Sequence, residues 1–343
     1  MSFFKKTNQI DLVTIGDMVV DTFIELIDAW TENDNPEKSR ELCMRFGDKI
    51  PYKEEVSIYG EGNSINAAHA AQRLGLKTAV ITNIGNDDLG DKCLKHLNKT
   101  GIETSGIVVH KNKKTNHNFV LRYKEDRTIL VHHNEYNYSL PKNFKISAKW
   151  IYLSSLSKNS LEFHSEIVNF LKRNPETKIA FQPGTFQIKL GAEKLAELYK
   201  MSEIFFCNKE EAVRILNTDE NNSSIENLLS GLKGLGVKLP VITDGPDGSY
   251  TYEDDLYGKI IHMDIYPDIA PPVDRTGAGD AFASAFSAAK YLGLDSKKAL
   301  MWGSINSMSV CQYVGAQEGL LSREKLENYL QTKPAGWEIE TIK

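Results

Sequence analysis

Short apolar runs recur along the chain, and they constrain its fold more than any other feature. Several, such as EIFFC at 203–207, are apolar without alternation, which is typical of strands covered on both faces. Helical patterns separate the runs, so the order predicts a doubly wound α/β domain whose mostly parallel sheet is flanked by helices. The predicted strands are 10–16, 78–84, 150–154, 178–182, 203–207 and 239–243. The predicted helices are 64–74, 88–99, 160–173, 190–200, 208–216, 224–235, 278–291, 296–313 and 322–331.

Two segments, 27–59 and 115–138, carry strand-like stretches but no helix of the length that a crossover needs. We predict that they form a small β-sheet lid over a ligand site. The alternatives are a decorative β extension or a dimer patch, and a lid can also join two copies in a homodimer. The predicted core is then 1–26, 60–114 and 139–343, which would bind nucleotide and substrate.

Composition narrows the classes of partner. The chain has 41 lysines and arginines against 46 aspartates and glutamates, a net charge of −5, so it has no general attraction for nucleic acid or anionic membranes. No apolar run approaches the roughly 20 residues that span a bilayer. We read no secretory signal and expect a cytoplasmic protein. The four cysteines are scattered, and His132 and His133 are expected to point to opposite faces of a strand, so neither disulfides nor a zinc site are predicted.

The strongest chemical signal is VDRTGAGDAF at 273–282. Gly277 and Gly279 bracket the start of a predicted helix, and small residues there leave the first backbone N–H groups unshielded. Such amides, together with the positive end of the helix dipole, form an anion site. The segment Gly277, Ala278 and Gly279 therefore predicts a cradle for a phosphate.

Asp280 follows directly in the first turn of this helix. Alone, it would be read as a carboxylate that stabilises the helix dipole. Next to two glycines and a small residue, it places one acid beside one anion site. Such an acid can accept a proton from an alcohol while the cradle holds the phosphoryl group that the alcohol attacks.

A second glycine-rich turn, GEGNSINAA at 60–68, opens an alanine-rich helix. It is not a dinucleotide fingerprint, because Ile65 occupies the third glycine position and the turn does not follow the first strand. A nicotinamide-dependent oxidoreductase is therefore disfavoured. Asn66 lies one turn into this helix, where it is a surface amide or a hydrogen-bond partner for a hydroxylated ligand.

These motifs resemble the ribokinase family of carbohydrate and nucleoside kinases, the PfkB family, over nearly the whole length. The family pattern D-x-x-G-A-G-D is matched by Asp274 and residues 277–280. The pattern G-G-x-x-x-N-x-A is matched at Gly62, Asn66 and Ala68, but Glu61 stands where the first glycine is usual. The resemblance implies a ribokinase-like fold with a β lid.

The resemblance also implies roles for single residues. Asp21, Gly62 and Asn66 would bind the substrate. Asn208 and Glu211 match N-x-x-E, which organises magnesium through water near the ATP phosphates. Asp274 and Thr276 resemble a monovalent-cation site that holds potassium. The further nucleotide contacts implied are Thr243, Gly245 and Gly248 in a T-x-G-x-x-G turn, and Ser304 and Asn306 beside the adenine.

The predicted function is an ATP-dependent kinase that transfers the γ-phosphoryl group to a hydroxyl of a sugar, as a ribokinase or fructokinase does. Asp280 would be the base and the amides of 277–279 the anion hole. A nucleoside kinase is the alternative, and a catalytically silent sugar- or nucleotide-binding regulator is the alternative from another class. Sugar phosphates are less favoured, because alternation along a strand should separate Arg122 from Arg127. Arg275 is either solvated or a phosphate contact.

Overall fold

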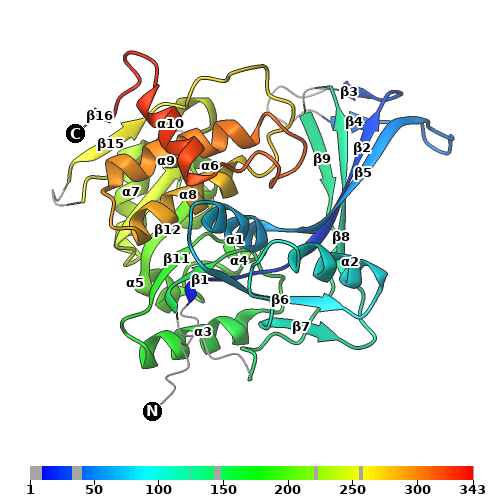
Figure 1. The fold of residues 1–343 in the computed structure, drawn as a ribbon, viewed down its shortest axis with the longest axis horizontal. Helices are drawn as coiled ribbons and strands as arrows, with labels where there is room; N and C mark the ends of the chain where they lie inside the picture. Colours follow the sequence, from blue (N-terminus) through cyan, green and yellow to red (C-terminus); the bar gives the residue numbers. More distant parts are fainter. Residues whose placement is uncertain are drawn as a thin grey trace, which may run out of the picture.

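The computed structural model describes residues 10–32, 41–124, 126–142, 148–219, 223–254 and 258–342. Its core is a 10-stranded sheet with the order β16-β15-β14-β13-β12-β11-β10-β1-β6-β7 (Figure 1). Adjacent strands are parallel from β13 to β7, and β14 to β16 add an antiparallel edge that was not predicted. The strands are β1 (Ile10–Ile15), β6 (Thr78–Gly85), β7 (Ile107–His110), β10 (Ala148–Leu153), β11 (Lys178–Phe181), β12 (Ser202–Asn208), β13 (Leu239–Thr243), β14 (Ser249–Tyr252), β15 (Ile260–Met263) and β16 (Glu340–Thr341).

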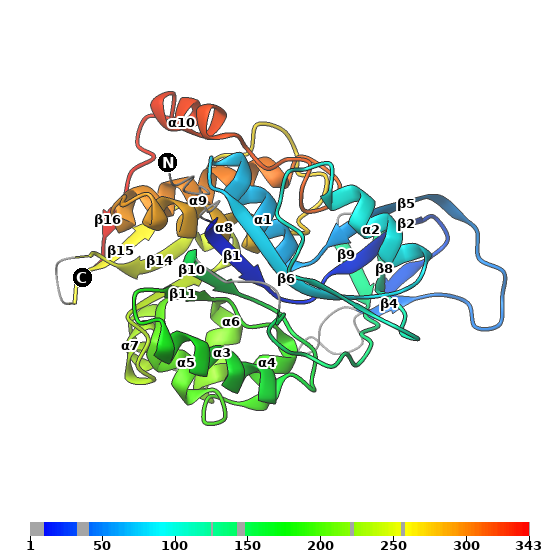
Figure 2. The same ribbon diagram turned by 60° about the horizontal axis from the view of Figure 1, so that its bottom comes forward.

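Helices cover both faces of this sheet, as predicted (Figure 2). Successive strand residues point to opposite faces, so Leu12 packs in one apolar layer and Val13 in the other. The first layer includes side chains of α1 (Asn63–Arg73), α8 (Ala278–Tyr291), α9 (Ser296–Val310) and α10 (Arg323–Gln331). The second includes those of α3 (Leu161–Arg173), α5 (Ala196–Met201), α6 (Lys209–Leu216) and α7 (Ile225–Gly234). No helix of the described residues is long and apolar enough to cross a membrane.

The predicted helix at 190–200 is wrong as a single element. The chain forms α4 (Thr185–Leu190) and then α5, with a break between them. Gly191 caps α4 with a φ of 87°, a backbone conformation that interrupts a helix and that glycine adopts without strain. The separate α4 matters for function, because it follows β11 and so places side chains near the carboxyl end of that strand.

A separate small sheet with the order β5-β2-β8-β9 stands beside the core, at the upper right of Figure 1. Its strands are β2 (Val19–Leu26), β5 (Tyr52–Glu61), β8 (Asn116–Tyr123) and β9 (Asp126–Leu130), and a two-stranded ribbon of β3 (Trp30–Glu32) and β4 (Glu41–Cys43) adjoins it. The lid prediction included 33–40, which lie outside the described residues.

The position of β2 differs from the predicted boundary between the core and the lid, because residues 1–26 were expected in the core. β2 instead pairs with β5 and β8, so the small sheet begins at Val19 and β5 continues to Glu61. His132 and His133 follow β9 instead of lying in a strand, which also differs from the prediction. The turn between β1 and β2 therefore carries the chain directly from the core sheet into the small one.

The strand order fixes where a ligand can bind. β1 pairs with β6 on one side and β10 on the other, so connections run in opposite directions from β1. In open α/β sheets such a switch point leaves a crevice at the carboxyl ends of the strands. The small sheet begins at that same end, since β2 follows β1 after a short turn.

Candidate active site

A cavity of about 570 Å³ lies at the carboxyl ends of the core strands. It is lined by the small sheet through Asp21 and Asn118, and by the core through Gln182, Asn208 and Thr243. Residues 275–280, the end of the loop before α8 and the first residues of that helix, also line it. The structure thus brings most of the predicted site residues to one place.

The carboxylate of Asp280 is fixed in this cavity by hydrogen bonds from three side-chain amides. It is 8% exposed and lies in the first turn of α8. Its Oδ1 accepts hydrogen bonds from Asn63 Nδ2 at 2.8 Å and Gln182 Nε2 at 3.3 Å, and its Oδ2 accepts one from Asn66 Nδ2 at 3.0 Å. Burial raises the pKa of Asp280, and the three amides act in the opposite direction. A fixed carboxylate with a raised pKa suits a general base near neutral pH.

Asn66 has protein partners that the sequence did not predict. Its Nδ2 donates to Asp280, and its Oδ1 accepts a hydrogen bond from Gln317 Nε2 at 3.1 Å. Gln317 also donates to the carbonyl of Gly60 at 2.7 Å. The structure therefore makes Asn66 a support for Asp280, and its contact with substrate stays a prediction.

The glycine-rich turns bring α1 and α8 into contact with their neighbours. Gly62 has a φ of 115°, and a Cβ there would lie 2.4 Å from the carbonyl oxygen of Asp17. Gly277 has a φ of 80°, and its Cβ would lie 2.3 Å from the Cβ of Ala316. At both positions the backbone conformation and the lack of space require glycine.

Gly279 differs from both, because a Cβ there would meet nothing within 4 Å. Within the described ranges, the amides of Gly277 and Gly279 have no hydrogen-bond acceptor, as expected at a helix N-terminus. Gly279 lines the cavity. The space beside it and the free amides fit a bound anion.

Asp21 and Glu61 are among the further carboxylates that line the same cavity, and with Asp280 we call them the acidic trio: Asp21, Glu61 and Asp280. Asp21 accepts a hydrogen bond from Asn118 Nδ2 at 3.0 Å, and burial raises its pKa to about 6. Glu61 is 1% exposed, and its Oε1 has no hydrogen-bond partner within the described residues. Burial, with the charges of Asp21 and Asp280, raises the pKa of Glu61 well above its usual range.

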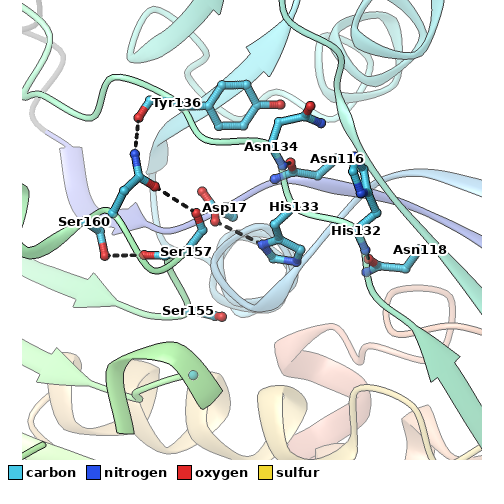
Figure 3. A network of polar contacts seen from close by, with 12 residues as sticks. Asp17, Asn116, Asn118, His132, His133, Asn134, Tyr136, Ser155, Ser157 and Ser160 are labelled. Atoms are coloured by element: carbon cyan, nitrogen blue, oxygen red, sulfur yellow. Dashed lines mark hydrogen bonds and ion pairs between the residues drawn. The ribbon is translucent and has the colours of Figure 1, made fainter. Parts of the chain in front are cut away.

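Asp17 anchors a polar network beside the cavity (Figure 3). It is 3% exposed and accepts hydrogen bonds from Tyr138 Oη at 2.7 and 3.0 Å. His133 Nδ1 lies 3.4 Å from Asp17 Oδ2. Figure 3 shows the His133 ring turned toward Asp17, and His133 also lines the cavity. The network therefore ties the segment after β9 to the end of β1.

The far side of the cavity is formed by the ends of β12 and β13. Asn208 caps α6 through a reciprocal pair: its Oδ1 accepts from the Glu211 N–H at 2.8 Å, and Glu211 Oε2 accepts from the Asn208 N–H at 2.9 Å. Burial raises the pKa of Glu211. Asn208, Glu211 and Thr243 all line the cavity, and their contact with a nucleotide stays a prediction.

Several predicted residues lie elsewhere. Asn306 is fully buried, donates to the carbonyl of Ala281 and accepts from the N–H of Leu321, both at 3.0 Å. Ser304 donates to the carbonyl of Asp264 at 3.2 Å. Contrary to prediction, both pack the core and do not line the cavity. Gly245, Gly248 and Asp274 are also absent from its lining.

Asp274 stabilises the loop that leads into the cradle at residues 277–279. Its Oδ1 accepts from the Thr276 N–H at 2.9 Å and the Thr276 hydroxyl at 2.8 Å, and its Oδ2 accepts from the Gly315 N–H at 3.1 Å. Asp274 is 7% exposed. Its carboxylate thus holds the loop before α8 against the loop after α9.

Sequence reasoning missed some residues that line the cavity. Asn63 lies beside predicted residues, and Asp17 and Gln182 follow core strands at their carboxyl ends, where ligand groups gather. Strand position was therefore a usable signal for all three. Asn118 and Arg127 come from the small sheet, whose pairing the sequence does not reveal.

Comparison with known sequences relates the chain to one family of kinases. Residues 18–323 match the model of the pfkB family carbohydrate kinases. An ATP-dependent 6-phosphofructokinase of Thermoanaerobacterium thermosaccharolyticum is 26% identical, over 89% of this chain and 89% of that protein. A nucleoside kinase of Methanothermobacter thermautotrophicus is 24% identical, over 90% of this chain and 92% of that protein.

Solved structures show the same fold. A putative ribokinase from Agrobacterium tumefaciens aligns with a TM-score of 0.75 at 18% identity, over 94% of this chain and 98% of that chain. The Arabidopsis thaliana ribokinase complexed with ribose and ATP also has a TM-score of 0.75, at 20% identity, over 94% and 99% of the two chains. At these identities the likeness concerns the fold alone.

Proposed function

Because the chain belongs to the pfkB family of carbohydrate kinases, phosphotransferases with an alcohol acceptor, we propose that it transfers the γ-phosphoryl group of ATP to a hydroxyl of a sugar. One observation supports this proposal more strongly than any other. The Asp280 carboxylate is held by three amides beside the free amides at the start of α8, in one cavity. A base next to an anion cradle is the arrangement that this transfer needs.

In the proposed reaction, the acceptor oxygen forms a bond to the γ-phosphorus as the bond from that phosphorus to the bridging oxygen breaks. ADP leaves with the electron pair of the broken bond, and the acceptor proton passes to a carboxylate oxygen of Asp280. Asn63, Asn66 and Gln182 hold both carboxylate oxygens in place. The base is therefore positioned before any substrate arrives, which lowers the cost of orienting it.

The amides of Gly277 and Gly279 would accept the charge that spreads over the phosphoryl oxygens during transfer. They are backbone groups at a helix start, so they need no rearrangement to do so. Closure of the small sheet would exclude water that could intercept the phosphoryl group.

The nucleotide side fits a magnesium complex of ATP. Mg²⁺ is usually held by one or two carboxylates together with phosphates and waters. Glu211 supplies one carboxylate there, and its hydrogen bond from the Asn208 N–H uses a single oxygen, Oε2. When bound, the ion would neutralise part of the phosphate charge. Thr243 would line the same phosphate region.

A monovalent cation would act below the cradle, at Asp274 and Thr276. The Asp274 carboxylate is buried and has no ion-pair partner within the ranges that the structure describes. A potassium ion there would balance this charge and stiffen the loop before α8. Activity in potassium chloride, compared with equal choline chloride, tests the site; equal rates would contradict it.

The test of the proposed function is ADP release with magnesium, across pentoses, hexoses, nucleosides and sugar phosphates. We expect acceptor-dependent ADP release with at least one sugar, and transfer of ³²P from γ-labelled ATP to that sugar. Nucleosides as sole acceptors would make the chain a nucleoside kinase. ATP binding without ADP release, with every acceptor, would identify a silent nucleotide-binding regulator.

We also propose that the small sheet joins two copies of the chain. Large apolar side chains are exposed on one face of it: Phe119 is 39% exposed, and Leu130, its partner across β8 and β9, is 52% exposed. Exposed apolar groups gathered on one sheet are typical of interaction sites. Sedimentation equilibrium should give a dimer, and Phe119→Lys with Leu130→Lys should give a monomer. A monomeric wild type would contradict the proposal.

A further inference from the structure

The predicted separation of Arg122 from Arg127 is wrong. The two residues are Cα partners across β8 and β9, and paired residues of this kind lie on the same side of a sheet, where like charges repel. Arg122 also pairs with Glu25 of β2. The hydrogen bond from Lys53 lowers the pKa of Glu25 most, and the charge of Arg122 lowers it further. Arg122 thus has an acidic neighbour, whereas the facing residue of Arg127 repels it.

Arg127 lines the cavity together with Ile129 and Val131, at alternate positions along the chain. Its Nε is buried and has no hydrogen-bond partner within the described residues. Leaving a buried donor unpaired costs free energy, and more so when the group is charged. The Nε of Arg127 is therefore free to donate a hydrogen bond to a ligand, because none of the described protein groups accepts one from it.

Two further cations line the same cavity from other elements, and with Arg127 we call them the basic trio: Arg127, Lys189 and Arg275. Lys189 comes from α4 and Arg275 from the loop before α8. None of the three forms an ion pair in the part of the chain that the structure describes. Burial raises the pKa of the Cys311 thiol, and the charges of Arg275 and Arg127 both lower it, so each of these two cations lies within electrostatic reach of Cys311.

The position of Arg127 indicates the acceptor side of the cavity. Asn118, on neighbouring β8, donates to Asp21 at 3.0 Å, and both residues line the cavity from the small sheet. The predicted nucleotide side is formed instead by Asn208 and Thr243, at the ends of core strands. Arg127 therefore belongs with the groups that face the acceptor.

We propose that the acceptor of this kinase carries an anionic group, a phosphate or a carboxylate, which the basic trio binds while the acidic trio faces the sugar hydroxyls. The proposal rests on the proposed function and names the substrate class of the same site. Guanidinium groups bind phosphate and carboxylate through paired hydrogen bonds. The two chemistries share this recognition, so the test separates them.

The first experiment compares matched acceptors: fructose with fructose 6-phosphate, ribose with ribose 5-phosphate, and glucose with gluconate. We expect kcat/KM to be about 10- to 100-fold higher for the anionic member of at least one pair, as a charged hydrogen bond supplies. A preference for the esters assigns phosphate, and a preference for gluconate assigns carboxylate. Equal or better use of all neutral members would overturn the proposal and leave the proposed function intact.

The second experiment uses Arg127→Gln, with Arg122→Gln as a matched control on the facing strand that does not line the cavity. Arg127→Gln should raise the KM for the anionic acceptor about 10- to 100-fold, with the KM for ATP unchanged. Arg122→Gln should leave both unchanged. An increase in the KM for ATP alone would place Arg127 at the nucleotide and overturn the proposal.

A binding measurement separates the two proposals. Calorimetric titration with fructose 6-phosphate, ribose 5-phosphate and gluconate, without ATP, should show binding of at least one to the wild type and at least tenfold weaker binding to Arg127→Gln. Such a result without turnover of any acceptor would keep the anionic site and refute the kinase. Absence of binding for all three anions would overturn the anionic site.

Discussion

Asp280 and Asp21 of the acidic trio line one cavity with Arg127 of the basic trio, but the carboxylates and the guanidinium are held in opposite ways. Asp280 has hydrogen bonds from three amides, and Asp21 has one from Asn118. Arg127 has a buried Nε without a partner within the described ranges. Groups that are satisfied without ligand are positioned for chemistry, and groups that are not gain most when a ligand binds. The comparison assigns catalysis to Asp280 and selection of the acceptor to Arg127.

Replacing the base should have the largest effect. Asp280→Asn keeps the shape of the side chain but removes the proton acceptor, so kcat should fall about 10²- to 10⁴-fold. Acceptor affinity should change little, because the basic trio is intact. The measurement is steady-state kinetics with ATP in excess, with circular dichroism to verify the fold. A kcat within a few fold of wild type would show that Asp280 is not the base.

The two glycines of the cradle should respond differently. Gly279→Ala adds a methyl group that meets no protein atom within 4 Å, so the protein should fold normally. The methyl group would occupy space next to the phosphate, and turnover should fall on the order of 10²-fold, as when one oxyanion donor is lost. The measurement is kcat beside the thermal midpoint.

Gly277→Ala is the matched comparison. Its Cβ would lie 2.3 Å from the Cβ of Ala316, at a φ of 80°. This variant should lose stability by about 1–3 kcal/mol, the range for a strained backbone. If Gly279→Ala lost stability and Gly277→Ala did not, the assignment of the two glycines would be reversed.

Weakening the support of the base should have a smaller effect that depends on pH. Asn63→Ala removes one of the hydrogen bonds that lower the pKa of Asp280. The pKa then rises, so the base is protonated at higher pH and the acidic limb of the kcat profile moves upward. At pH values on the acidic limb of the profile, turnover should fall about tenfold, and it should recover at alkaline pH.

A pH-independent loss would show that Asn63 acts on folding or binding instead. Asn66→Ala provides the comparison, because Asn66 donates to the other carboxylate oxygen. It should shift the profile in the same direction.

Much of this arrangement could be predicted from the sequence. Apolar runs without alternation predicted the parallel core sheet, because such strands are buried on both faces. The motif around Asp280 predicted the helix start, since small residues and an acid there have a local physical reason. Asp21 and Asn66 were predicted from a resemblance, and the structure brings both to the cavity.

The remaining features depend on contacts between distant segments. The pairing of β8 with β9 determines that Arg122 and Arg127 lie opposite each other. A shift of the strand register by one residue would turn every side chain of the strand to the other face of the sheet. Asn306 matched a functional position in the sequence, but it hydrogen-bonds inside the core. Local patterns contain neither the register of a hairpin nor the partner of a buried amide.

The smallest effect should come from Glu61, the member of the acidic trio with an unpartnered oxygen among the described residues. Its pKa is raised by burial, so the carboxyl stabilises the fold at acid pH, where both folded and unfolded states are protonated, and that contribution is lost as pH rises through the folded pKa. Glu61→Gln cannot ionise. Its thermal midpoint should therefore match that of wild type near pH 4 and exceed it increasingly toward pH 8.

Glu54→Gln is the matched control, since Glu54 lies on the same strand but is exposed. Its thermal midpoint should stay with that of wild type at every pH, because an exposed carboxylate is solvated in both states. A difference at Glu61 that is constant with pH would mean that packing or a new hydrogen bond, and not the buried charge, separates glutamate from glutamine there. In that case Glu61 would be a neutral hydroxyl-facing group throughout the working range, and only Asp21 and Asp280 of the acidic trio would ionise opposite the basic trio.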